Sequence, residues 1–221
     1  MIEPVRAKIG AGEGIRTLDP DLGSAVWPTI AGENETMADT VGILAYGSLI
    51  EDPGPEIEPY ITRRISCRTP FNVEFARTSR TRKGGPTLVP NDDGSSVAAQ
   101  ILAVSVSLKE ATDRLYCRET RKSDSNISYV PPKKITPNTV VVESRQSFEG
   151  IETVLYTKIG ANIDGLTAFK LAELAVNSAR ARQDGKDGIS YLMNAKKCGI
   201  QTPLSLDYEN EILRLTGNGQ P

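Results

Sequence analysis

Short apolar or alternating runs follow Met37, and helical spacing of apolar residues dominates the C-terminal part of the chain. Runs of this length, several bounded by Pro, Gly or Asn, predict strands over 41–46, 71–76, 86–90, 97–106, 138–143 and 152–157. Helices are predicted over Leu166–Ala181, over Ile189–Lys197 with Gly199 as a stop, and from a Ser205 cap to near Gly217. This order predicts an α+β fold with a mostly antiparallel or mixed curled sheet, and not a regular β-α-β alternation.

A further helix is expected directly after the strand 97–106. Ser107 and Glu110 form the Ser-x-x-Glu pattern of a capping box, which sets the helix start and hence its phase. The residues that face the core are then Leu108, Ala111 and Leu115. Glu119 continues this stripe, and removal from water raises a carboxyl pKa into a range suited to proton transfer. The alternative is a Glu at a frayed helix end, paired with Arg118, Arg121 or Lys122.

The strand 41–46 runs into the turn Tyr46-Gly47-Ser48-Leu49. Gly47 can take a backbone conformation that residues with a Cβ avoid, so the chain can reverse there. The N–H groups of Gly47, Ser48 and Leu49 then lack ladder partners and can form a concavity for a carboxylate or a developing oxyanion. The alternative is a strand-ending turn in which Gly and Ser serve conformation alone.

The amino-acid composition excludes several kinds of catalysis and metal binding. The 221 residues include no histidine, which excludes Ser-His-Asp and Cys-His catalysis, His-ligated zinc and imidazole acid/base chemistry. Three widely spaced cysteines, Cys67, Cys117 and Cys198, predict neither a disulfide framework nor a metal cluster, and they favour a reduced cytoplasm. No apolar run has the length of a membrane span, and no cofactor is expected.

The first 36 residues differ from the rest in being rich in Gly, Pro and charge without sustained periodicity. They are interpreted either as a disordered extension or as the product of a mis-assigned start, with the natural protein beginning at Met37. The second hypothesis rests on Gly14-Ile15-Arg16-Thr17, whose possible coding sequence resembles the antisense of a transfer RNA T-arm. Residues 37–221 are expected to form a single domain.

That division leaves the domain nearly neutral. Residues 1–36 hold three basic and six acidic residues, so 23 basic and 22 acidic residues remain in 37–221. No nucleic-acid or membrane partner is therefore expected. The basic segment 77–85 is interpreted as a solvated loop, with the alternative that Arg77 or Arg80 reaches a substrate carboxylate.

Three sequence elements together resemble the γ-glutamylcyclotransferase-like superfamily over roughly Val41–Gly217. They are Ala45-Tyr46-Gly47-Ser48-Leu49, Gly84-Gly85-Pro86-Thr87-Leu88-Val89-Pro90, and Arg118-Glu119 after a capped helix. The resemblance implies a small β-barrel or curled sheet flanked by helices. It also implies release of 5-oxoproline from a γ-glutamyl compound, with neither a metal nor a protein nucleophile.

Under this resemblance, Tyr46, Gly47, Ser48 and Leu49 grip the α-amino-acid end of the γ-glutamyl group, and Glu119 is the catalytic acid/base. The glutathione-specific branch continues its Arg-Glu pair with Gly-Gly-Tyr, whereas this chain reaches a tyrosine only at Tyr129. A γ-glutamyl dipeptide or γ-glutamyl amine is therefore the expected substrate, and Tyr129 either closes over it or is a hydroxyl at a sheet edge. The alternative function is a non-catalytic member of the fold that binds a small carboxylate metabolite or a protein partner.

Overall fold

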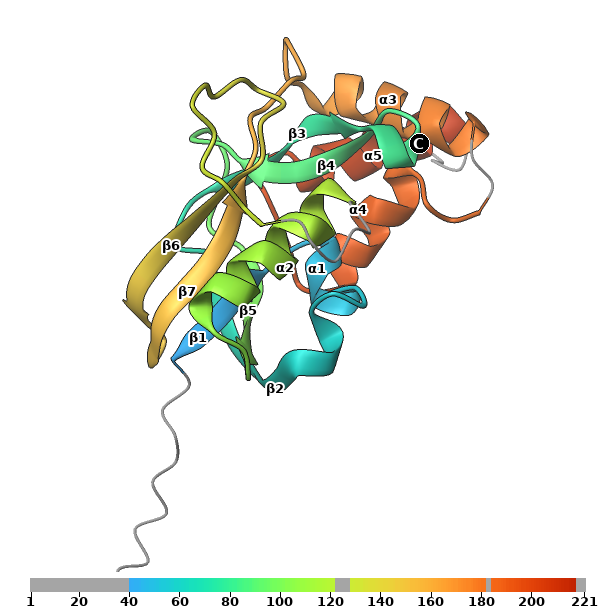
Figure 1. Cartoon of the computed structure of the whole chain (residues 1–221). Helices are drawn as coiled ribbons and strands as arrows, with labels where there is room; N and C mark the ends of the chain where they lie inside the picture. Colours follow the sequence, from blue (N-terminus) through green and yellow to red (C-terminus); the bar gives the residue numbers. More distant parts are fainter. Residues whose placement is uncertain (1–39, 122–127, 182–183, 218–221) are drawn as a thin grey trace, which may run out of the picture. The chain divides into compact units, whose positions relative to one another are not determined.

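Two sheets and several helices make up the computed structural model, which describes residues 40–121, 128–181 and 184–217 (Figure 1). The predicted extension, residues 1–36, lies outside the described residues. The strands are β1 (Val41–Ala45), β2 (Ile61–Arg68), β3 (Val73–Ser79), β4 (Gly85–Pro90), β5 (Ala98–Val104), β6 (Val141–Phe148) and β7 (Ile151–Lys158). The helices are α1 (Ser48–Glu51), α2 (Leu108–Thr120), α3 (Ala168–Ala181), α4 (Gly188–Lys197) and α5 (Ser205–Thr216), with 3-10 turns η1 (Glu58–Tyr60) and η2 (Arg80–Arg82).

The larger sheet is mixed and open. Its five strands follow the order β2-β5-β1-β7-β6, in which β1 is antiparallel to β5 and parallel to β7. The outermost strands, β2 and β6, each pair on one side only, so the sheet is not a closed barrel. The mixed α+β class is confirmed, and the β-barrel alternative is wrong because β3 and β4 pair with each other as a separate sheet.

The centre of the larger sheet is covered on both faces. All five residues of β1 are buried. On one face, Ala111 and Leu115 of α2 pack with Ile43 and Leu102, as the helix phase predicts. Leu108 is the exception, since its side chain is 45% exposed. Helical side chains lean toward the N-terminus, so a residue at the first helical position points past the helix start and not onto the sheet.

The C-terminal helices pack on the β3–β4 sheet around a second core, whose largest buried members include Phe75, Leu171, Leu192 and Tyr208. The rings of Phe75 and Tyr208 meet edge to face at 5.5 Å. Figure 1 shows α3, α4 and α5 gathered on the β3–β4 side of the fold.

Glu74 joins β3 to the start of α5, although it is 1% exposed. Its carboxylate accepts hydrogen bonds from Phe75 N–H (2.8 Å), Thr202 Oγ1 (2.6 Å) and Leu204 N–H (3.2 Å). Leu204, and not Ser205, occupies the cap position of α5, so the predicted cap is wrong by one residue. Ser205 is the first helical residue, and its hydroxyl accepts from Thr202 N–H at 2.8 Å.

The sequence prediction missed one strand, β2. Most of its residues are exposed or half-exposed and several are cationic, so its apolar signal is weak. A polar, charged strand at a sheet edge discourages pairing with another chain, which explains why it resembles a loop in sequence. Within the described ranges, every helix is too short or too polar to span a bilayer.

Candidate functional site

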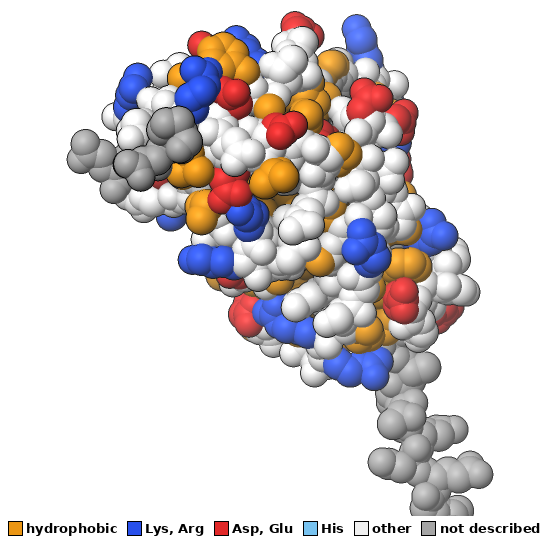
Figure 2. Space-filling model, turned by 180° about the vertical axis from the view of Figure 1, so that it is seen from behind, with side chains coloured by type: hydrophobic (Ala, Val, Ile, Leu, Met, Phe, Trp, Pro, Cys, Tyr) orange, Lys and Arg blue, Asp and Glu red, His pale blue; other side chains and the backbone are white. Residues whose placement is uncertain are grey.

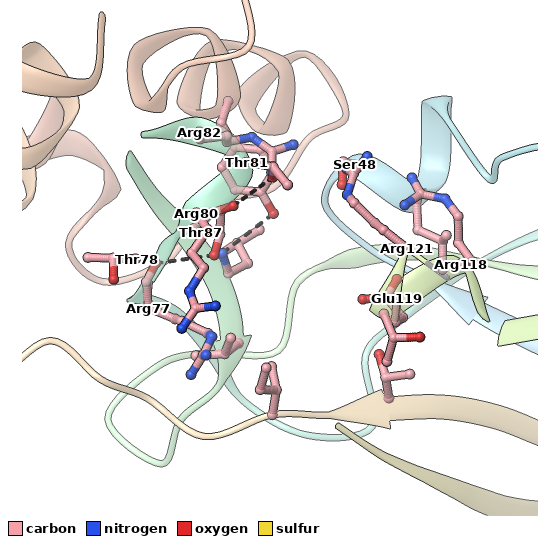
Figure 3. Close-up of a pocket in the computed structure, with 18 of the residues that line it drawn as sticks. Ser48, Arg77, Thr78, Arg80, Thr81, Arg82, Thr87, Arg118, Glu119 and Arg121 are labelled. Carbon is pink, nitrogen blue, oxygen red and sulfur yellow. Dashed lines mark hydrogen bonds between the residues drawn. The ribbon is translucent and has the colours of Figure 1, made fainter. Parts of the chain in front are cut away.

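A pocket of about 410 Å³ lies where the end of β1, the end of α2 and the η2 turn face one another (Figure 3). Five of the seven predicted site residues line it: Tyr46, Ser48, Leu49, Arg80 and Glu119. Residues separated widely in sequence are therefore brought to one cavity. Its volume falls within the range of about 300–1,000 Å³ that is typical of small-molecule sites.

The turn after β1 depends on Gly47, which has φ 58° and ψ −133°. A Cβ at this position would lie 2.4 Å from the Tyr191 hydroxyl, so glycine is required by both conformation and space. The Tyr191 hydroxyl accepts hydrogen bonds from the backbone N–H groups of Leu88 (3.4 Å) and Ser48.

Two of the three backbone N–H groups of the turn therefore already donate to groups within the protein. Besides the bond from Ser48 N–H to Tyr191, Leu49 N–H donates to the Tyr46 carbonyl at 3.4 Å. This second bond belongs to the turn that starts α1, and its length makes it weak. Tyr191 was not singled out from the sequence, where it is one aromatic residue in an amphipathic helix.

Glu119 faces the pocket from the last turn of α2. Water reaches its side chain through the pocket, yet the surrounding protein displaces enough of its hydration to raise the pKa of the carboxyl. The charges of Arg118, Arg121 and Arg82 oppose this rise. Among the described residues, no hydrogen bond or ion pair to the Glu119 carboxylate is found. The alternative of a pairing with Arg118 or Arg121 is not observed, and Arg118 instead donates to the Asp52 and Pro53 carbonyls. Lys122, the third partner considered, lies outside the described residues.

Tyr46 lies next to this carboxyl. Burial raises the pKa of the Tyr46 phenol well above its ordinary range, and the negative charge of Glu119 raises it further. Its ring meets Phe71 edge to face at 5.8 Å, which fixes the ring orientation. The Tyr46 hydroxyl consequently stays protonated and is a potential hydrogen-bond donor at the pocket wall.

Two of the pocket arginines hold the backbone in place. Arg77 donates to the carbonyls of Pro137 and Gly160, both at 2.7 Å, and to Asn138 Oδ1 at 2.8 Å. Arg118, which is 9% exposed, donates to the Asp52 carbonyl at 2.6 Å and the Pro53 carbonyl at 3.0 Å. Their guanidinium groups tie loops to the pocket wall while their charge still acts on the cavity.

Arg80 and Arg121 differ from these two. Both line the pocket and both are exposed, and neither has an ion pair or hydrogen bond from its guanidinium to another described residue. The η2 turn that carries Arg80 is itself fixed, because the buried Ser178 hydroxyl donates to the Arg82 carbonyl and accepts from Gly188 N–H at 3.1 Å. Arg80 is therefore an uncommitted cation on an anchored turn.

Tyr129 lies away from the pocket. Its hydroxyl accepts from Val142 N–H of the edge strand β6 at 3.1 Å, and its ring lies 5.2 Å from that of Tyr116. The structure thus matches the alternative of a hydroxyl at a sheet edge and does not bring Tyr129 to the other candidate residues. The different spacing from Glu119 was the signal in the sequence that pointed this way.

The described part of the chain contains no group of three or more His, Cys, Asp or Glu side chains able to hold a metal ion. Cys67, Cys117 and Cys198 form no disulfide with one another, and none of them lines the pocket.

The chain was compared with protein families, curated proteins and solved structures. No protein-family model, no curated protein and no solved structure matches the chain.

Proposed function

We propose that this chain is a γ-glutamylcyclotransferase-type enzyme that releases 5-oxoproline from a γ-glutamyl dipeptide or γ-glutamyl amine. The observation that carries the proposal is the shared pocket of the Tyr46–Leu49 turn and Glu119. The mixed α+β fold is compatible with the γ-glutamylcyclotransferase-like superfamily that the sequence resembles. A cytoplasmic location remains part of the proposal, supported by three cysteines that are not joined in disulfides.

The proposed reaction is a cyclisation within the substrate. The α-amine attacks the γ-carbonyl, a new C–N bond closes the five-membered lactam, and the original γ-amide C–N bond breaks. The α-ammonium loses two protons in becoming the lactam N–H, and the departing nitrogen gains two protons as it leaves as an ammonium. Glu119 accepts and returns these protons one at a time, so no proton is gained or lost overall. General acid/base action of this kind contributes about 10²–10⁴-fold.

Positioning supplies much of the remaining acceleration. Well-oriented intramolecular reactions reach effective molarities on the order of 10⁵–10⁸ M, so the pocket mainly has to fold the substrate back on itself. The raised pKa of the Glu119 carboxyl suits a group that must both take and give a proton near neutrality. The Tyr46 hydroxyl lines this pocket and is the donor proposed to stabilise the developing oxyanion.

A second candidate is a non-catalytic protein of the same fold that binds a small carboxylate metabolite. Two observations favour it: arginines dominate the charged lining, and part of the turn's donor set is already bound to Tyr191. Both functions need the arginines, but only catalysis needs the Glu119 carboxyl.

The deciding experiment measures 5-oxoproline release from γ-glutamyl dipeptides, γ-glutamyl amines and glutathione by the wild type and by Glu119→Gln. Activity in the wild type that falls about 10²–10⁴-fold in a folded Glu119→Gln protein supports the enzyme. Lys170→Gln, an exposed change on α3 away from the pocket lining, is the matched control. Wild-type protein that binds these compounds without turnover favours the second candidate.

A further inference from the structure

The pocket holds far more positive than negative charge. Its described lining residues include five arginines and one acid, Glu119. On the face shown in Figure 2, by contrast, acidic and basic side chains are interspersed. Residues 37–221 are also nearly neutral as a whole. Because concave sites lined by one sign of charge concentrate ligands of the opposite sign, an anionic ligand is expected.

The excess of positive charge is distributed unevenly across the pocket. Figure 3 shows Ser48, Glu119 and Arg121 on one side and Arg77 with Arg80 on the other. Glu119 offsets cations on its own side, since Arg118 and Arg121 both act on its pKa. No acidic residue lines the opposite side within the described ranges. There, burial lowers the pKa of Arg77 and the charge of Arg80 lowers it further, which indicates repulsion that no anion relieves.

Resting on the proposed function, we infer that the preferred substrate is a γ-glutamyl dipeptide whose leaving residue is itself acidic, with its carboxylates bound by Arg80 opposite Glu119. The reacting amide lies at the Glu119 side, where the acid/base and the Tyr46–Leu49 turn are found. The leaving residue then extends toward Arg80, whose guanidinium has no partner among the described residues and can bind a carboxylate through two parallel hydrogen bonds.

The number of carboxylates distinguishes this substrate from simpler γ-glutamyl compounds. A γ-glutamyl amine offers one carboxylate and one ammonium, so it brings no net negative charge to the pocket. A dipeptide with a neutral leaving residue adds a second carboxylate. An acidic leaving residue adds a third, which meets the unrelieved cations of Arg77 and Arg80.

The test compares kcat/KM for γ-glutamyl-glutamate and γ-glutamyl-glutamine, two dipeptides of nearly equal shape that differ by one charge. The expected preference for γ-glutamyl-glutamate is about tenfold to a hundredfold, as for one charge-assisted hydrogen-bonding contact. Arg80→Gln should bring the ratio close to one, because the larger loss of kcat/KM falls on γ-glutamyl-glutamate. Lys170→Gln, which removes one exposed cation from α3, should preserve the preference.

The outcomes separate the two proposals. Turnover of both dipeptides with no preference for the acidic one overturns this inference and leaves the cyclotransferase in place. A preference that survives in Arg80→Gln also overturns it, because Arg80 would then not be the group that recognises the leaving residue. No release of 5-oxoproline from any γ-glutamyl compound overturns the proposed function and this inference together.

Discussion

Glu74 and Glu119 are two carboxylates set in opposite surroundings. Glu74 is 1% exposed and accepts hydrogen bonds from Phe75, Thr202 and Leu204. Glu119 lines the pocket, and its carboxylate has no hydrogen bond to another described residue. The satisfied carboxylate holds α5 on β3, whereas the unsatisfied one is left available to a ligand.

The difference follows from what burial does to a charge. A carboxylate that loses water is stable only when other donors replace it, and the N–H groups at the start of a helix are suitable donors. Glu74 receives one such donor from the start of α5, the Leu204 N–H, and two more from Thr202 and Phe75. Glu119 is exposed to the pocket and has only the longer-range attraction of nearby arginines, which does not cancel the rise in its pKa.

The largest expected effect is on activity at position 119. Glu119→Asp keeps the carboxylate but shortens the side chain by one methylene group. A misplacement of about 1 Å at a reacting centre can cost about 10²-fold, so 5-oxoproline release should fall by roughly that factor. Thermal unfolding should change little, because the carboxylate holds no described residue in place. Unchanged kcat would remove Glu119 from the proton-transfer role.

Glu74→Gln should show the reverse pattern. The new amide group would present donors to N–H and hydroxyl groups that now donate to a carboxylate. A buried donor left unsatisfied costs about 1–3 kcal/mol, so the free energy of unfolding should fall by about that amount. Urea denaturation measures the loss, and kcat of the remaining folded protein should stay near the wild-type value. Full stability in this variant would refute the structural role.

Sequence patterns predicted the local parts of this comparison and missed the long-range parts. The capping pattern at Ser107 and the apolar spacing of Ala111 and Leu115 are local, and the structure confirms both. The placement of Glu119 beside a turn more than seventy residues earlier depends on how α2 packs, which periodicity alone does not encode.

Two failures have the same origin. The β-barrel that the family resemblance implied is wrong, because β3 and β4 form a sheet of their own and strand patterns do not reveal which strands pair. The engagement of the turn by Tyr191 was missed because that residue belongs to α4, far along the chain. Local sequence patterns therefore predict helices and strands, whereas tertiary packing determines which side chains come into contact.

Tyr129→Phe extends the comparison to a hydroxyl. The Tyr129 hydroxyl accepts from Val142 N–H, so it behaves as a satisfied structural group like Glu74. Its loss should lower the free energy of unfolding by about 0.5–1.5 kcal/mol, the net contribution of one hydrogen bond. The kinetics of 5-oxoproline release should be unchanged. A rise in KM without a loss of stability would return Tyr129 to the substrate site.

The smallest expected effect is the pH dependence of stability that Glu119 introduces. Its folded-state pKa is raised above the unfolded value, so the folded protein binds the proton more tightly. The associated stability is present below the unfolded pKa and is lost as pH rises through the folded pKa. Glu119→Gln cannot ionise, so its stability relative to the wild type should increase with pH across that window. Parallel denaturation curves of the two proteins over pH measure this difference, with Lys170→Gln as a control that should follow the wild type. A wild type that instead gains stability relative to Glu119→Gln as pH rises would mean that Glu119 is satisfied in the folded protein, as Glu74 is, and the contrast between the two carboxylates would fail.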